Sequence, residues 1–210
     1  MMARRFWGAA LAAACLGGCV TNPPPRENEA AASVAFEALK RGGYVIVMRH
    51  ANSPEDQTSF VGLSEGCRLA PGRGLDAEGF FQARAMGAVL KAEGVPILKA
   101  YTSPMCRSWD TAALAASGAP VEPDPSQISE KPADVAAMKA KVAAELAAHP
   151  GTNIILSSHS NIAPLYGATT RGREKVVPSG VAWLVHPSDW QPIARVDLLI
   201  RYPEAKPAVE

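Results

Sequence analysis

The feature that most limits the possible folds is a series of short apolar runs separated by longer, helix-like segments. The first run, Tyr44–Met48, is continuous, apolar and rich in β-branched residues, which is typical of a strand buried on both faces. Ile97–Thr102 and Asn153–Leu156 are predicted as further strands of this kind. Strands that alternate with helices in this way form a mostly parallel sheet with helices on both faces. The sequence therefore predicts an α/β domain.

Glycine, proline and capping residues divide the rest of this domain into elements. Predicted helices cover Ala30–Arg41, a segment from the N-cap Asp76 to Leu90, a segment from Ser103-Pro104 to Ser117-Gly118, Ala133–Ala148, and a short piece near Ala163–Ala168. The proline-rich stretch between residues 119 and 132 is predicted as a loop. Val181–Val185 and Ile193–Ile200 are predicted as two closing strands in a hairpin.

The N-terminal segment has the organisation of an export signal. Arg4 and Arg5 supply the positive charge, and residues 6–16 form an apolar stretch that is too short to span a bilayer. It ends in Leu16-Gly17-Gly18-Cys19, which resembles a bacterial lipobox, the motif whose cysteine is lipidated before cleavage. An ordinary secretory signal cut elsewhere is the alternative, and a twin-arginine route is a weaker one.

Processing at this point divides the chain into segments. We expect a signal peptide over residues 1–18, a lipidated Cys19 with a flexible tether over 19–32, a domain over 33–203 and a tail over 204–210. The predicted location is the bacterial envelope, anchored to the outer membrane and facing the periplasm. Loss of two arginines changes the net charge from +1 to +1 − 2 = −1. Neither value shows the basic excess of a nucleic-acid-binding protein.

Basic residues stand where each of the three predicted strands ends. Arg49-His50 follows the first strand, Arg107 falls in the first turn of the helix after the second, and His159 follows the third. Because ligands bind beyond the carboxyl ends of parallel strands, these four side chains are expected to converge. Two guanidinium groups and two imidazoles beside a helix N-terminus suit a phosphate dianion.

These residue types also suggest a reaction. One imidazole can attack phosphorus and carry the phosphoryl group, while the other cationic groups stabilise the phosphoryl oxygens. With this much fixed positive charge no metal ion or other cofactor is expected. The leaving oxygen still requires a proton, which a protonated carboxyl group can supply.

Four motifs in order resemble the histidine phosphatase superfamily, which has the phosphoglycerate mutase-like fold. They are Arg49-His50, Leu75-Asp76-x-x-Gly79-x-x-Gln82-Ala83, Ser103-Pro104-x-x-Arg107 and the late Ser158-His159, and the match extends over about Gly43 to Ile200. The resemblance implies a three-layer α/β/α sandwich, a phosphorylated His50, and a phosphate pocket completed by Arg49, Arg107 and His159. It implies a small phosphate ester as the substrate.

The proton donor is less clearly marked. The family supplies a Glu or Asp from the region between the second and third strands, or an Asp directly after the second His, but here Ser160 follows His159. Glu130 is our prediction, since it precedes a helix, and Glu122, Asp124 and Asp134 remain alternatives. Ala51–Pro54 replaces the extended motif of the glycolytic mutases, so hydrolysis is favoured over mutase activity.

Several other patterns have competing interpretations. Cys67-x-x-x-x-x-Arg73 has the spacing of cysteine-dependent phosphatases, but no apolar strand precedes it and Gly74 follows Arg73. A disulfide between Cys67 and Cys106 is the preferred interpretation, with Arg73 near the phosphate site. A phosphate-ester-binding lipoprotein without turnover is the non-enzymatic alternative. His149 and His186 are predicted to be structural or exposed, because each precedes a proline away from a strand end.

Overall fold

The computed structural model describes residues 27–54 and 73–197 of the chain. The described helices and strands are α1 (Glu27–Arg41), β1 (Val45–Arg49), α3 (Ala77–Ala92), β2 (Ile97–Thr102), α4 (Cys106–Ala115), β3 (Val121–Pro123), α5 (Pro132–Ala148), β4 (Asn153–Ser158), β5 (Val181–Val185) and β6 (Pro192–Asp197). Two 3₁₀ turns, η1 (Pro125–Ile128) and η2 (Ala163–Tyr166), complete the set. The signal, Cys19, Cys67 and the tail of the sequence prediction lie outside the described residues.

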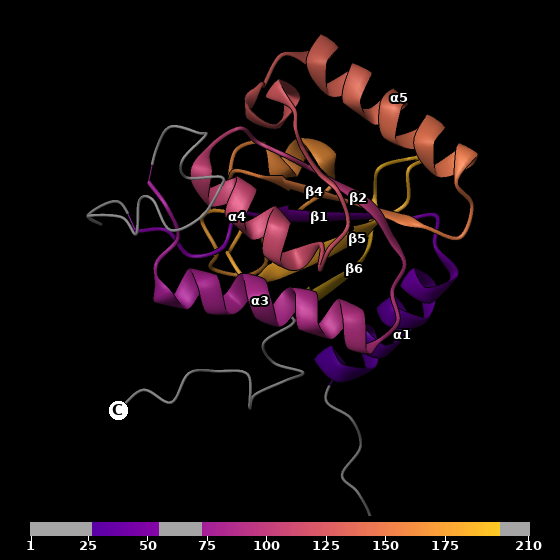
Figure 1. Ribbon diagram of the computed structural model, residues 1–210, viewed down its shortest axis with the longest axis horizontal. Helices are drawn as coiled ribbons and strands as arrows, with labels where there is room; N and C mark the ends of the chain where they lie inside the picture. Colours follow the sequence, from indigo (N-terminus) through magenta and orange to yellow (C-terminus); the bar gives the residue numbers. More distant parts are fainter. Residues whose placement is uncertain (1–26, 55–72, 198–210) are drawn as a thin grey trace, which may run out of the picture.

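The described strands form one sheet with the order β3-β2-β4-β1-β5-β6. β1, β2, β3 and β4 are joined by parallel pairings, whereas β5 pairs antiparallel with both β1 and β6. The predicted mostly parallel sheet is therefore confirmed, and so is the closing hairpin of β5 and β6. The parallel strands run in the same direction, so their N-termini lie at one end of the strands and their carboxyl ends at the other. At the carboxyl ends, β2, β4 and β1 are neighbours (Figure 1).

Helices cover both faces of this sheet, as the resemblance implies (Figure 1). In β1, Ile46 and Met48 pack into a core cluster with residues of α1, α3 and α4. The alternate residues, Val45 and Val47, pack into a second cluster with residues of α5 and η2. Successive side chains of a strand point to opposite faces, so a continuous apolar run supplies both cores. The fold is the predicted α/β/α sandwich.

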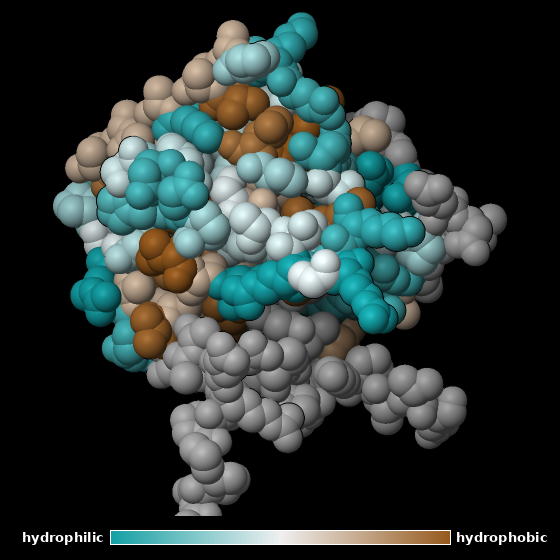
Figure 2. Space-filling model, turned by 180° about the vertical axis from the view of Figure 1, so that it is seen from behind, coloured by the Kyte–Doolittle hydropathy of each residue, from teal (hydrophilic) through white to brown (hydrophobic). Residues whose placement is uncertain are grey.

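The surface carries few large apolar side chains. Among the residues whose exposure is described, the large exposed hydrophobic ones are Val34, Ile128, Val176 and Ile193. In the view from behind, apolar patches are small and separated by hydrophilic residues (Figure 2). No helix in the described ranges is long and apolar enough to cross a membrane.

Two predicted boundaries are wrong for identifiable reasons. The proline-rich stretch at 119–132 contains β3 and η1; Pro123 is tolerated because β3 is an edge strand, with only one neighbour for its backbone. α1 begins at Glu27, so residues 27–32 are helical and not part of a flexible tether. This segment consists of Glu, Asn and Ala, and Glu and Ala favour helix.

The third strand continues further than its apolar residues indicated. β4 extends to Ser158 because it lies between β1 and β2, and both neighbours bind its polar end. The Ser103 N–H donates to the Ser157 carbonyl at 3.0 Å, and the His50 N–H donates to the Ser158 carbonyl at 2.9 Å. Backbone pairing on both sides therefore holds two serines in buried strand positions.

Candidate active site

The register of the sheet brings the predicted pocket residues to the same level. Met48 and Thr102 are both partners of Ser157, and Arg49 is the partner of Ser158. His50 and His159 are therefore the next residues on adjacent strands. Their ring centroids are 5.4 Å apart, in an edge-on arrangement. The convergence of the strand ends thus follows from the register.

Arg107 reaches the same place from α4. The helix begins at Cys106, later than the predicted start at Ser103-Pro104, but Arg107 is in its first turn as expected. Its Nη2 lies 3.3 Å from His159 Nδ1. Arg49 is held on the other side, where its Nη1 donates to the Val177 carbonyl at 3.1 Å. The four predicted residues are thus brought together.

The loop after His50 is fixed by the start of α3. Asp76 caps this helix by accepting the Gly79 N–H at 2.7 Å, and its other oxygen accepts the Asn52 side chain at 2.6 Å. Gln82 Oε1 accepts the Asn52 N–H at 2.9 Å. A Cβ on Gly79 would lie 2.1 Å from the Asn52 carbonyl oxygen, so only glycine permits this approach. The Leu75-to-Ala83 motif therefore braces the His50 loop.

The tautomer of His50 follows from its hydrogen bond. Its Nδ1 lies 2.8 Å from the Ala51 carbonyl oxygen, and a carbonyl can only accept. Nδ1 therefore carries the proton of the neutral ring, which leaves a lone pair on Nε2. A neutral imidazole with a fixed ring and an available Nε2 lone pair has the properties of a nucleophile.

Burial and neighbouring cations keep both rings neutral. His50 is only 3% exposed, and its burial is the main cause that lowers its pKa to about 3, with further lowering by Arg107, Arg49 and His159. Burial likewise lowers the pKa of His159 to about 4, with help from Arg107, Arg49 and Arg73. Burial, and then the charge of Arg73, lower the pKa of Arg49. The pocket therefore concentrates positive charge while both imidazoles stay unprotonated near neutral pH.

Arg73 is a further cation of this pocket. Its Nε donates to the Ser53 carbonyl at 2.8 Å and lies 3.0 Å from Ser53 Oγ. Ser53 is buried and stands three residues after His50 in the braced loop. The charge of Arg73 is close enough to act on both Arg49 and His159. The sequence associated Arg73 with the phosphate site only through its spacing from Cys67, which lies outside the described residues.

The four candidate proton donors are placed differently. Glu130 is exposed and accepts a hydrogen bond from Asn161, two residues beyond His159. The three alternatives have other partners: Glu122 pairs with Lys99, Asp124 with Lys141, and Asp134 accepts from Ser129. Of the four, Glu130 is the one whose side chain contacts the segment that carries His159. Asn161 was not singled out in the sequence.

The two remaining histidines lie at the surface. His149 and His186 are exposed, as predicted. Among the described residues there is no group of three or more His, Cys, Asp or Glu side chains that could hold a metal ion. The predicted disulfide involves Cys67, outside the described residues, so it stays a prediction. Cys106 itself is fully buried at the start of α4.

Comparison with known proteins agrees with this fold. Residues 45–128 match the model of the histidine phosphatase superfamily, branch 1. The fold resembles the protein histidine phosphatase SixA in complex with tungstate, with 18% identity, a TM-score of 0.54, and coverage of 75% of this chain and 99% of that one. It also resembles a putative phosphohistidine phosphatase SixA from Agrobacterium tumefaciens, with 14% identity, a TM-score of 0.52, and coverage of 73% and 97%.

At these identities the two structures show the fold alone. No curated protein sequence matches the chain. The match over residues 45–128 contains three of the four motifs, namely those at Arg49-His50, Leu75–Ala83 and Ser103–Arg107. The resemblance predicted from these motifs is confirmed over residues 45–128, which match the model of the histidine phosphatase superfamily, branch 1, and the α/β/α fold resembles that of the SixA structure.

Proposed function

We propose that the chain is a phosphatase that hydrolyses a small phosphomonoester through a phosphohistidine at His50. The observation that carries the proposal is the fixed His50 ring, whose Nδ1 is bound to the Ala51 carbonyl and whose Nε2 lone pair lies among the cations. Arg49, Arg107 and His159 bind the phosphoryl oxygens. These fixed positive charges stabilise the transition state without requiring a metal ion.

The reaction has two balanced steps. In the first, His50 Nε2 attacks phosphorus, the bond to the ester oxygen breaks, and the protonated Glu130 gives its proton to the leaving oxygen. In the second, water attacks the phosphohistidine, Glu130 takes a proton from that water, and the N–P bond breaks. The products are an alcohol and inorganic phosphate. The contact between Glu130 and Asn161 supports this choice of acid, because it holds Glu130 beside the segment of His159.

Acid-quench trapping tests the intermediate. The full-length chain is mixed with radiolabelled p-nitrophenyl phosphate and quenched, and an acid-labile, alkali-stable protein adduct is expected. His50→Ala should abolish both the adduct and turnover. His149→Ala is the matched control, since His149 is exposed and binds the Glu145 carbonyl; it should behave as wild type.

The same experiment separates the alternative functions. An adduct lost in Cys67→Ser but retained in His50→Ala would support the cysteine mechanism with Cys67 and Arg73. Binding of p-nitrophenyl phosphate without release of phosphate would support the non-enzymatic lipoprotein. Loss of turnover on treatment with a chelator, restored by a divalent metal, would contradict a mechanism in which arginines supply the charge.

We also propose that Cys19 carries the lipid anchor, on the strength of the Leu16–Cys19 motif. Cells fed a labelled fatty acid should transfer label to the wild-type chain and not to Cys19→Ser. Label in the variant would contradict lipidation at this residue. Fractionation of the wild-type cells should recover the chain with the outer membrane, and recovery with the inner membrane would contradict the proposed location.

A further inference from the structure

Ser103 is a buried hydroxyl that the proposed reaction does not use. It is the residue directly after β2, and its side chain is fully buried. Its Oγ lies 2.8 Å from His159 Nε2 and accepts the Met105 N–H at 3.1 Å. A serine oxygen can accept two hydrogen bonds, so this arrangement leaves room for a donor on His159.

The other nitrogen of His159 decides which atom is that donor. His159 Nδ1 lies 3.3 Å from Arg107 Nη2. A guanidinium nitrogen can only donate, so Nδ1 must be the acceptor. A neutral imidazole has one acceptor and one donor, and burial and the charges of Arg107, Arg49 and Arg73 keep His159 neutral by lowering its pKa. The ring proton therefore resides on Nε2 and points to Ser103.

We propose that Ser103 is a positioning residue that fixes His159 as the Nε2–H tautomer and so directs the Nδ1 lone pair toward the phosphate pocket. The two histidines then have opposite tautomers: His50 is protonated on Nδ1 through Ala51, and His159 on Nε2 through Ser103. The inference rests on the proposed function for the identity of the ligand at this pocket, but not for the tautomer itself.

The tautomer gives His159 a defined task when substrate arrives. A phosphoryl group draws Arg107 to its own oxygens, because a phosphate oxygen is a stronger acceptor than an imidazole nitrogen. The vacated Nδ1 then takes the proton of a substrate monoanion: the O–H bond breaks, an N–H bond forms, and the imidazolium donates back to the same oxygen. Ser103 Oγ keeps Nε2–H bonded throughout, so the ring does not turn.

The groups that face His159 come from several elements. His50 and Arg49 lie on the β1 side, Arg107 is on α4, and Arg73 precedes α3. The arginines cannot accept a hydrogen bond from Nε2–H. His50 has an acceptor on its own Nε2, but the hydrogen-bond contact of His159 Nε2 is with Ser103 Oγ at 2.8 Å. Ser103 supplies that acceptor as a neutral group, which adds no further charge to the ring.

Nitrogen NMR tests the proposal directly. The chain has four histidines, so the full-length protein labelled with ¹⁵N-histidine and purified in mild detergent gives four ring systems, which His→Gln variants assign. In the ligand-free wild type, His159 is expected as Nε2–H and His50 as Nδ1–H. A wild-type His159 with its proton on Nδ1 would overturn the proposal, whether or not any variant folds.

The variants add a kinetic readout. Ser103→Ala should produce a mixture of His159 tautomers and reduce kcat/KM for p-nitrophenyl phosphate by about 10-fold, the effect of one lost hydrogen bond. Ser103→Thr retains the hydroxyl and should restore the tautomer. The matched control is Ser157→Ala, which removes another buried hydroxyl, one that donates to the Ser108 carbonyl, and should leave the His159 nitrogen shifts unchanged.

The outcomes separate the two proposals. Unchanged His159 nitrogen shifts in Ser103→Ala would overturn the role of Ser103, even if phosphatase activity is present. The expected tautomers in a protein that never releases phosphate would support the role of Ser103 and contradict the proposed function alone.

Discussion

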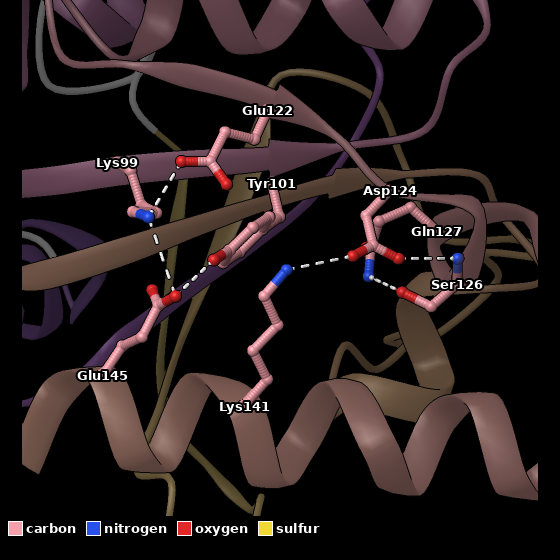
Figure 3. A network of polar contacts seen from close by, with 8 residues as sticks. All are labelled: Lys99, Tyr101, Glu122, Asp124, Ser126, Gln127, Lys141 and Glu145. Carbon is pink, nitrogen blue, oxygen red and sulfur yellow. Dashed lines mark hydrogen bonds and ion pairs between the residues drawn. The ribbon is translucent and has the colours of Figure 1, made fainter.

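The proposed phosphate pocket and the polar network between α5 and the sheet differ in how their charges are arranged. In the network, Lys99 lies 2.8 Å from Glu122 and 3.6 Å from Glu145, and Lys141 lies 3.2 Å from Asp124 (Figure 3). Every ammonium group therefore has a carboxylate beside it. In the pocket, the guanidinium groups of Arg49, Arg73 and Arg107 act on His159 in the same direction.

This difference in charge pairing indicates that the two regions have different roles. The network also binds the Tyr101 hydroxyl, which donates to Glu145 at 2.5 Å, and the Lys141 ammonium lies 4.1 Å from the centre of the Tyr101 ring. Its groups stabilise one another and hold α5 to β2 and β3. Within the described residues, the pocket buries a charged donor, Arg49 Nε, without a hydrogen-bond partner, whereas the buried unpaired atoms of the network, Gln127 Oε1 and Glu145 Oε2, are acceptors. A buried donor without an acceptor costs free energy, and an anionic ligand that accepts from it can relieve that cost.

The largest effect is expected at Glu130, the proposed proton donor. Glu130→Gln should lower kcat for phenyl phosphate by about 10²–10⁴, the usual contribution of a general acid. In kcat/KM, which reports the first step alone, the loss should be much smaller for p-nitrophenyl phosphate, because its leaving group departs without a proton. Steady-state kinetics with both esters measure the contrast. Glu122→Gln, in the network, is the control and should have little effect on the hydrolysis of either ester. A near-normal rate for Glu130→Gln would show that another carboxylate is the general acid.

The second largest effect is expected at Arg107 in the pocket. Arg107→Lys keeps the charge but removes the planar fork that fits phosphoryl oxygens. Its kcat/KM for p-nitrophenyl phosphate should fall by about 10²–10³. Arg195→Lys is the matched control, because Arg195 pairs with Glu174 through two nitrogens and is not one of the residues proposed to bind the phosphoryl group. Equal losses in the two variants would indicate a general effect on folding.

Much of this pocket could be predicted because its residues follow from local rules. A buried strand ends where its apolar run ends, and the carboxyl ends of neighbouring parallel strands meet; this placed Arg49, His50, Arg107 and His159 together. The helix start at Asp76 likewise has its own capping signal. None of these inferences requires knowledge of a distant contact.

The features that the sequence did not predict depend on contacts between residues that are far apart in the chain. Ser103 meets His159 across 56 positions, and Asn161 meets Glu130 across 31. Both contacts depend on the register of β4 with its neighbours and on the path of η1, which the sequence does not encode locally. The short strand β3 was missed for a related reason: its proline, Pro123, argues against a strand unless one knows that β3 lies at the edge of the sheet.

A smaller effect is expected on the stability of the fold in acid, and it should arise from the two histidines of the pocket. The unfolded chain binds protons at His50 and His159 below about pH 6.5, whereas the folded pocket resists protonation until the pKa values of about 3 and 4 are approached. Folding therefore loses stability as pH falls from 6.5 toward 4. After allowance for solvent screening, a loss of about 2 kcal/mol between pH 7 and pH 5 is expected.

Urea unfolding at the two pH values measures this loss. His50→Asn should remove part of it, and saturating inorganic phosphate should reduce it by binding the folded pocket. The matched variant His149→Asn, at an exposed site, should keep the full wild-type pH dependence. If the His50 variant also kept the full dependence, its ring could not be a source of the acid sensitivity.

The smallest effect is expected in the network. Lys141→Met removes the partner of Asp124, an ion pair with side chains 42% and 22% exposed, and such pairs contribute about 0.2–1 kcal/mol. A double-mutant cycle with Asp124→Asn, followed by urea unfolding, should give a coupling energy in this range. Turnover should stay within about twofold of wild type in all three variants, because the balanced charges are not needed by the phosphoryl group. A large loss of kcat in Asp124→Asn alone would instead make Asp124 the proton donor and remove the distinction between the two regions.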